Sequence, residues 1–323
     1  MRQKCLEAGC DAPKSLCKVH LSPNYQDCEH WRRISTEQSV SPTSVGEGTG
    51  IPWSGMELTP ESIEILSHRS TPVIIGLVGA ANAGKTSYLG MLYTLLFNGR
   101  KFDHWKFAGS YTLIAWEAQA KGLKIGSNGK VPFPKATPSQ PDYYSLYHLA
   151  LKKDKQLYDI LFADSSGEVF TKWAADTGSD EAENAKWIYE NSNAFIFFVD
   201  CEALINEKGR ARNSVSQLAS QISANLNGRP VVIVWSKADR INEIPPIIKA
   251  SVESLLLNNF ADVPQFMISN FSKTTEDELC YVNNIAACET ILNAATLVKK
   301  LSIHPILPDS TDFFFNYHGN KSK

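Results

Sequence analysis

The chain has 323 residues, with 32 Lys and Arg against 34 Asp and Glu, a formal net charge of -2. This near balance argues against a nucleic-acid coat or a polybasic membrane binder, so a nucleic-acid partner is not indicated. A hydrophobic share of 43% excludes wholesale disorder. Because no apolar run is long enough to cross a bilayer and the first residues lack a secretory signal's apolar core, we expect a cytoplasmic protein.

The first 33 residues hold a cluster of cysteines and histidines. The expected zinc ligands are Cys5, Cys10, Cys17 and His20, with Cys28 and His30 as alternates. So short a segment has no adequate core, so a bound metal would supply most of its folding free energy. We predict a structural zinc module over residues 1–33, the alternative being a disordered tail with reactive thiols.

Residues 34–52 are rich in Ser, Thr and Gly and have almost no large apolar side chains, which predicts a flexible linker. A short helix is expected to begin at Pro60, with Thr59 as its N-cap. The main domain is expected over residues 53–302. The tail, residues 303–323, carries an aromatic run that is more often a packed strand than a ligand site and, if exposed, would mark a partner surface.

From residue 73 onward, apolar strands alternate with helices. We expect strands at 73–78, 143–151, 156–163, 194–199, 231–235 and 265–268, and helices at 85–97, 110–122, 180–190, 213–226, 246–258 and 276–300. A polar turn at residues 152–155 joins the second and third strands as a hairpin. The pattern predicts a three-layer α/β fold whose sheet is mostly parallel, with one antiparallel hairpin strand.

A glycine-rich segment follows the first of these strands and opens the first long helix. Its sequence, GAANAGKT, has the G-x-x-x-x-G-K-[ST] spacing of a P-loop, in which backbone N–H groups and a helix N-terminus bind phosphate. Lys85 is expected to reach the β- and γ-phosphates, and the Thr86 hydroxyl to ligate Mg²⁺. The expected nucleotide contacts here are Gly79, Asn82, Ala83, Gly84, Lys85, Thr86 and Ser87.

Two further motifs follow later strands. In the D-x-x-G sequence DSSG, Asp164 is expected to hold Mg²⁺ through water, and the Gly167 N–H to contact the γ-phosphate. The sequence SKAD is similar to the guanine-reading N-K-x-D element, with Ser236 in place of Asn. The Asp239 carboxylate would accept hydrogen bonds from guanine N1 and N2, which adenine cannot donate, while the Lys237 stem would lie along the base.

Together, the lead-in helix, GAANAGKTS, DSSGE and SKAD resemble translation-factor-like P-loop GTPases of Ras-like fold. Within that class the chain looks most like the bacterial double-GTPase proteins, and the resemblance covers roughly residues 58–316, about four fifths of the chain. It implies that Thr137 is a switch I threonine that closes on Mg²⁺ and the γ-phosphate. It also implies that Ser269 and Asn270 lie in a loop that closes over the base.

The resemblance further implies a GTP-hydrolysing switch whose loops control binding to a protein partner, a second GTPase being the expected one. The expected catalytic residues are Lys85, Thr137, Gly167 and Glu168. Glu168 stands where many Ras-like enzymes have glutamine. Its carboxylate could accept a hydrogen bond from the attacking water, but its negative charge predicts slow turnover. The alternative is that Glu168 is simply a solvated residue.

Asn82 gives the loop a form similar to that of potassium-stimulated GTPases, in which K⁺ lies beside the phosphates. The simpler interpretation is a loop residue that tolerates an unusual backbone angle. Two other functions remain open for the whole chain. One is a nucleotide-dependent binding scaffold with negligible turnover, and the other is an ATPase, against which SKAD argues.

Overall fold

The computed structural model describes residues 2–5, 31–34, 55–123, 137–140, 142–270 and 277–297. The chain divides into two compact units, Met1–Pro52 and Trp53–Lys323. In the first unit, strands β1 (Arg2–Cys5) and β2 (Trp31–Ile34) pair antiparallel.

Most of the predicted zinc module cannot be compared with the structure. Cys5 ends β1, but Cys10, Cys17, His20, Cys28 and His30 lie outside the described residues, as do residues 35–52 and the tail, residues 303–323. Within the described part of the chain, no group of three or more His, Cys, Asp or Glu side chains is placed to hold a metal ion.

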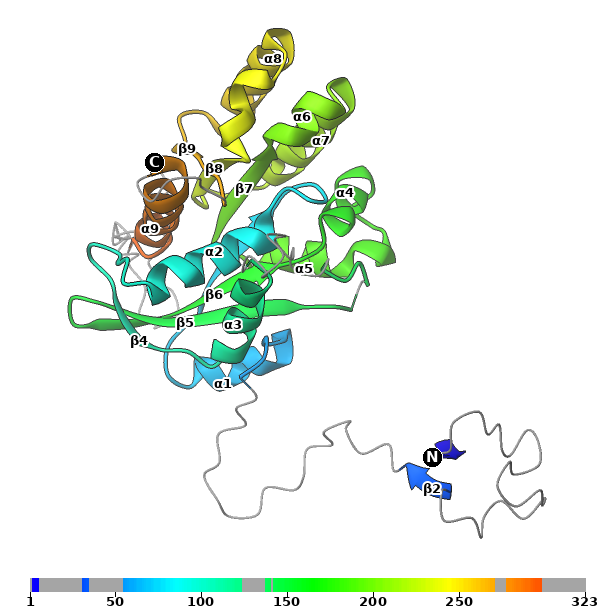
Figure 1. Ribbon diagram of the computed structural model, residues 1–323, viewed down its shortest axis with the longest axis vertical. Coiled ribbons are helices and arrows are strands. Elements are labelled where there is room, and N and C mark those ends of the chain that lie inside the picture. The colour runs from blue at the N-terminus through cyan, green and yellow to red at the C-terminus, as the bar shows by residue number, and fades with distance from the viewer. Residues whose placement is uncertain are drawn as a thin grey trace, which may run out of the picture. The chain divides into compact units, whose positions relative to one another are not determined.

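A seven-stranded sheet forms the centre of the second unit, in the order β4-β5-β6-β3-β7-β8-β9 (Figure 1). The strands are β3 (Val73–Val78), β4 (Lys106–Gly109), β5 (Ser145–Lys153), β6 (Gln156–Asp164), β7 (Ala194–Asp200), β8 (Val231–Ser236) and β9 (Gln265–Met267). In this sheet β5 pairs antiparallel with both β4 and β6, whereas the other neighbours pair in parallel. The predicted mostly parallel sheet with one reversed hairpin strand is therefore confirmed.

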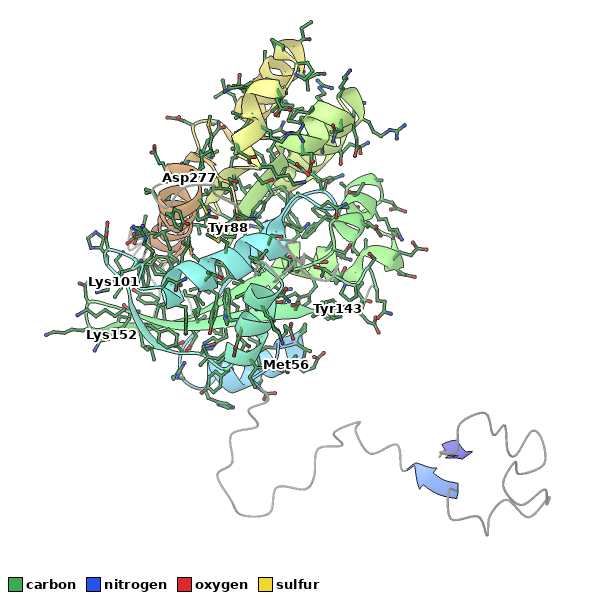
Figure 2. All side chains as sticks on the ribbon, in the orientation of Figure 1. Met56, Tyr88, Lys101, Tyr143, Lys152 and Asp277 are labelled. Atoms are coloured by element: carbon green, nitrogen blue, oxygen red, sulfur yellow. The ribbon has the colours of Figure 1, made fainter. Side chains whose placement is uncertain are left out.

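Helices cover both faces of the sheet and enclose two apolar cores. One face carries α2 (Lys85–Phe97), α3 (Leu113–Lys121) and α9 (Asn283–Ala295). The other carries α1 (Ile63–Ser67), α4 (Gly167–Ala175), α5 (Glu183–Asn191), α6 (Cys201–Asn206), α7 (Gly209–Ala224) and α8 (Pro246–Phe260). Every residue of β7 is buried, because this strand lies between helices on both faces. Tyr88 (labelled in Figure 2) ties α2 to α9 by donating its hydroxyl to the Asn284 carbonyl at 3.1 Å.

Several predicted boundaries differ from those in the structure. The helix expected at 110–122 is present as α3, which begins at Leu113, but the edge strand β4 before it was not predicted, because an exposed edge strand lacks the apolar run that marks buried strands. The helix expected at 180–190 begins as a 3₁₀ turn, and the one expected at 276–300 begins as a π-helical turn at Glu278–Val282. None of the helices in the described ranges is long and apolar enough to cross a membrane.

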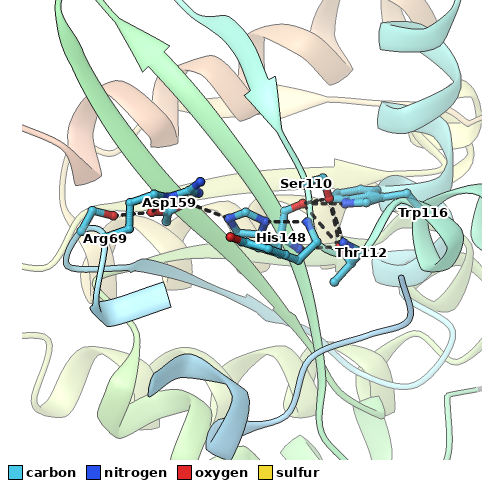
Figure 3. Close-up of polar contacts among 8 residues, drawn as sticks. Arg69, Ser110, Thr112, Trp116, His148 and Asp159 are labelled. Carbon is cyan, nitrogen blue, oxygen red and sulfur yellow. Dashed lines mark hydrogen bonds and ion pairs between the residues drawn. The ribbon is translucent and has the colours of Figure 1, made fainter. Parts of the chain in front are cut away.

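A buried polar network fixes the β5–β6 hairpin to its neighbours (Figure 3). The His148 Nδ1 atom accepts the Tyr111 backbone N–H at 3.0 Å, which places the ring proton on Nε2, facing the Asp159 carboxylate at 2.9 Å. Arg69 Nε donates to the same carboxylate at 3.1 Å. Burial alone would raise the pKa of Asp159, but hydrogen bonds from His148, Arg69 and Ser70 outweigh it and hold this pKa well below its ordinary range.

Candidate functional site

A cavity of about 550 Å³ opens where the parallel strands end. Its described lining follows β3, β6, β7, β8 and β9 in the chain and includes two residues of the segment before β5. The carboxyl edge of a parallel sheet is where α/β proteins bind ligands. Among the predicted nucleotide contacts, those that line the cavity are Asn82, Ala83, Gly84, Lys85, Thr86, Ser87, Ser236, Lys237, Asp239, Ser269 and Asn270.

The loop between β3 and α2 has the backbone that its glycine-rich sequence predicts. Gly84 and Asn82 both have a left-handed conformation, with φ of 84° and 59°. Asparagine adopts this conformation more readily than most residues, so the backbone alone accounts for Asn82. The Lys85 ammonium curls back over the loop and donates to the carbonyls of Gly79 at 3.0 Å and Ala80 at 3.1 Å. Gly79 thus supports the site without lining the cavity.

Lys85 and Asp164 are opposite charges buried at the floor of the site, with 5% and 1% of their surfaces exposed. Burial lowers the pKa of Lys85 to about 8, although the nearby Asp164 carboxylate opposes the change. Burial likewise raises the pKa of Asp164, against the opposing effects of Lys85 and of hydrogen bonds from Thr86 and Thr137. An anion bound beside Lys85 would therefore favour its charged form, and a cation bound beside Asp164 would favour its charged form.

Three oxygen-bearing side chains from distant parts of the chain meet beside Lys85. The Thr86 hydroxyl donates to the Asp164 Oδ2 atom at 2.6 Å and lies 2.9 Å from the Thr137 hydroxyl. Thr137 also donates to Asp164 Oδ2, at 3.4 Å. The other carboxylate oxygen, Asp164 Oδ1, is buried and has no hydrogen-bond partner among the described residues. A carboxylate and two hydroxyls form a donor set suited to Mg²⁺.

The segment before β5 contacts the start of α4. The Ser139 hydroxyl lies 2.9 Å from the Ser166 hydroxyl and donates to Glu168 Oε2, also at 2.9 Å. Ser166 is the N-cap of α4, accepting the Glu168 backbone N–H at 3.3 Å. Gly167 is pressed against the P-loop, since a Cβ atom built on it would lie 2.1 Å from the carbonyl carbon of Ala80. The P-loop and the following helix, the segment before β5 and the start of α4 are thus in direct contact.

Another part of the cavity wall is formed by the end of β8 and the loops after β8 and β9. Ser236 is buried, whereas Asp239 is exposed and lines the cavity. The Lys237 ammonium is held by Asp200 Oδ2 at 2.8 Å and Glu202 Oε2 at 2.9 Å. Arg240 pairs with the same Glu202 side chain at 3.1 Å. The Lys237 ammonium is thereby held by two carboxylates, and Lys237 and Asp239 both line the cavity.

Sequence reasoning did not identify several described residues of the cavity wall: Ala81, Ser139, Ser165, Ser166, Glu202 and Arg240. Two of them had a signal, since Ser165 and Ser166 are the unspecified positions of D-x-x-G. Glu202 and Arg240 also had a sequence signal. Glu202 closely follows the aspartate that ends β7, and Arg240 directly follows the SKAD sequence. Ser139 had no signal beyond its nearness to Thr137.

Residues 73–295 match the family model of Double-GTPase 2, whereas no protein with a curated description matches the chain. Among solved structures, a putative nucleolar GTP-binding protein 1 from Plasmodium falciparum is similar at 16% identity and a TM-score of 0.40, over 69% of this chain and 86% of that one. Methanosarcina barkeri Roco2 bound to GDP is similar at 16% and 0.35, over 69% and 48%. A Sulfolobus solfataricus GTP-binding protein in complex with GDP is similar at 18% and 0.35, over 72% and 55%. The chain thus spans about half the length of the last two, while the family match runs from β3 through α9.

Proposed function

The chain belongs to the Double-GTPase 2 family, and from this premise we propose that it is a Mg²⁺-dependent switch that binds and hydrolyses GTP. The observation that carries the proposal is the meeting of Thr86, Thr137 and Asp164, which join the P-loop, the segment before β5 and the end of β6. A ligand that holds this contact orders two otherwise separate segments. Hydrolysis would release them, which is how a GTPase changes its affinity for a partner.

These three residues would hold Mg²⁺, which when bound neutralises charge on the phosphate oxygens. The buried Asp164 Oδ1 atom supports this assignment, because it has no hydrogen-bond partner in the described part of the chain, an unpaired carboxylate oxygen is costly, and a cation would satisfy it. The P-loop backbone and Lys85 would bind the β- and γ-phosphates. The Gly167 N–H would donate to the γ-phosphate from the other side.

For the chemical step, we assign Glu168 as the acceptor of a hydrogen bond from the attacking water, with Ser139 holding its carboxylate in place. Turnover should be slow without a partner. Among the described cations of the cavity wall, Lys237 and Arg240 are already paired with carboxylates, which leaves Lys85 to stabilise the transition-state charge. The same observation favours the second candidate, a nucleotide-dependent scaffold with negligible turnover. GTP turnover measured with and without a second GTPase as partner separates the two.

The test of base recognition is Asp239→Asn. Its amide N–H would face the guanine 2-amino group, donor against donor, but would complement the 2-oxo group of xanthine. The variant should lose about tenfold or more in GTP affinity and gain affinity for XTP, measured by fluorescent-nucleotide titration with Mg²⁺ and again with EDTA. ATP that competes with GTP equally well in the wild type would instead identify an ATPase.

The remaining parts of the proposal are supported by sequence. Zinc in residues 1–33 and a cytoplasmic location stand as predictions, and purified chain without stoichiometric zinc would contradict the first. Potassium stimulation through Asn82 predicts faster GTP hydrolysis in KCl than in NaCl. Equal rates would leave the left-handed backbone as the reason for this asparagine.

A further inference from the structure

Ser165 stands out among the hydroxyl groups of the cavity wall. It lies between Asp164 at the end of β6 and Ser166, the N-cap of α4, and only 1% of its surface is exposed. Its Oγ atom has no hydrogen-bond partner among the described residues, although the residue lines the cavity. The neighbouring Ser166 hydroxyl, in contrast, is engaged with Ser139 and the start of α4.

A buried hydroxyl without a partner is unfavourable, because it has given up its hydrogen bonds to water. The residues around Ser165 limit which kind of ligand could accept a hydrogen bond from its hydroxyl. Asp164 and Glu168 are acidic groups close to Ser165 in the chain, and the neighbours of Asp164 are the Lys85 ammonium and the Thr86 hydroxyl. A cation with negatively charged oxygens around it fits this surrounding, and phosphate oxygens accept a hydroxyl proton readily.

The place of Ser165 in the cavity wall indicates which phosphate group of the nucleotide its hydroxyl could contact. Asp239 belongs to the SKAD sequence assigned to the base, whereas Ser165 directly follows Asp164, which is part of the Thr86–Thr137–Asp164 contact. Gly167, two residues on, is pressed against the P-loop backbone, which holds the inner phosphates. The phosphate farthest from the base is therefore the one within reach of this segment.

We propose that the Ser165 hydroxyl donates a hydrogen bond to the γ-phosphate, which makes it a binding residue that discriminates GTP from GDP. The inference rests on the proposed function and adds to it a side-chain contact made only with the triphosphate. Ser165 thereby couples the start of α4 to the presence of the terminal phosphate.

The test is Ser165→Ala, with affinities for GDP and for a non-hydrolysable GTP analogue measured in Mg²⁺ by calorimetry. Loss of a hydrogen bond to a charged oxygen should weaken the analogue by about tenfold or more, while GDP changes by less than about twofold. Ser192→Ala is a matched control. Its hydroxyl is also buried and unpartnered among the described residues, but Ser192 does not line the cavity, so both affinities should stay unchanged.

Thermal unfolding without nucleotide separates binding from a structural role. Removing a hydroxyl that lacks a partner should not lower Tm, so Ser165→Ala and Ser192→Ala should both match the wild type or exceed it. A lowered Tm with unchanged analogue affinity, or an equal loss for GDP and the analogue, overturns the inference. Ser165→Cys, close in volume but a poor donor, gives the same answer if the alanine variant does not fold. A wild type that binds neither nucleotide refutes the proposed function itself, and this inference with it.

Discussion

At the scale of single residues, the charge of Lys85 governs how the cavity responds to pH. Its pKa is lowered to about 8 by burial, and bound phosphates favour the charged form. Triphosphate affinity should therefore fall as pH rises through 8 and be about tenfold weaker at pH 9 than at pH 7. The effect on folding stability has the opposite sign. Between about pH 8 and 10.4 the unfolded chain binds more protons than the folded one, so the free energy of unfolding of the nucleotide-free protein increases as the pH rises across this window.

Nucleotide titrations from pH 7 to 9 check this prediction. Lys85→Arg is the matched control, because a guanidinium stays charged and any binding that remains should not decline in this way. An identical decline in both proteins would show that another group titrates.

Gly167 makes the closest approach in the site, and a side chain there has no room. A Cβ atom would lie 2.1 Å from both the Ala80 carbonyl carbon and the Ala81 nitrogen, so Gly167→Ala must push α4 away from the P-loop. Such overpacking costs about 1–3 kcal/mol and should lower Tm by about 2–10 °C in a thermal melt. Gly209→Ala is the control, since no atom lies within 4 Å of that site and its Tm should not fall. A Gly167→Ala protein that melts like the wild type would contradict the contact.

At the scale of elements, the β5–β6 hairpin depends on Asp159. Asp159→Asn keeps the shape but removes the charge that holds Arg69 and His148, which should cost about 2–3 kcal/mol at pH 7. Because the folded pKa of Asp159 is depressed, its stabilisation is present above about pH 4 and is lost as pH falls further. Urea unfolding of the two proteins should therefore converge in acid. Asp154→Asn, at the exposed hairpin turn with φ of 54°, should change little.

The elements differ in how well the sequence predicted them, for physical reasons. Strands β3, β7 and β8 are buried on both faces, so their sequences are continuous apolar runs. Strand β4 is an exposed edge with Lys106 opposite Lys152, and no such run marks it. Helix α4 begins at Gly167 inside D-x-x-G, where Asp, Ser and Gly stand in place of the apolar pattern of a helix start.

The residues of the candidate site likewise divide into those that a sequence pattern marks and those that it does not. The P-loop, Asp164 and SKAD are recognisable because phosphate, metal and base impose fixed residue types at fixed spacing. Ser139 reaches the cavity through tertiary placement, and a serine in a loop gives no pattern by which to find it. Ser165 occupies an unspecified position of D-x-x-G, so the motif marks the position without fixing the residue type. The contact between Thr86 and Thr137 likewise joins residues far apart in the chain.

At the scale of the molecule, nucleotide binding should stabilise the unit that begins at Trp53. At a concentration about 100 times Kd, GDP or GTP with Mg²⁺ should add about 2.7 kcal/mol and raise Tm, whereas the same concentration of ATP should not. Differential scanning fluorimetry measures this directly. A chain of residues 53–323 should show the same rise, because all described residues of the cavity wall lie beyond Pro52. A rise that vanishes in the shortened chain would place part of the site in residues 1–52.

The reversed strand β5 has a consequence for how this fold can vary. The chain enters each parallel strand at the edge away from the cavity, but it enters β5 at Ser145, opposite Asp164, the last residue of β6. In Figure 2, Tyr143 lies just before the start of this strand and Lys152 lies near its end. The described segment before β5, which carries Thr137 and Ser139, is therefore brought to the cavity wall by one reversal of chain direction. Under the proposed function, a substitution at Ser139 would alter the switch while leaving both apolar cores intact, because neither core contains this residue.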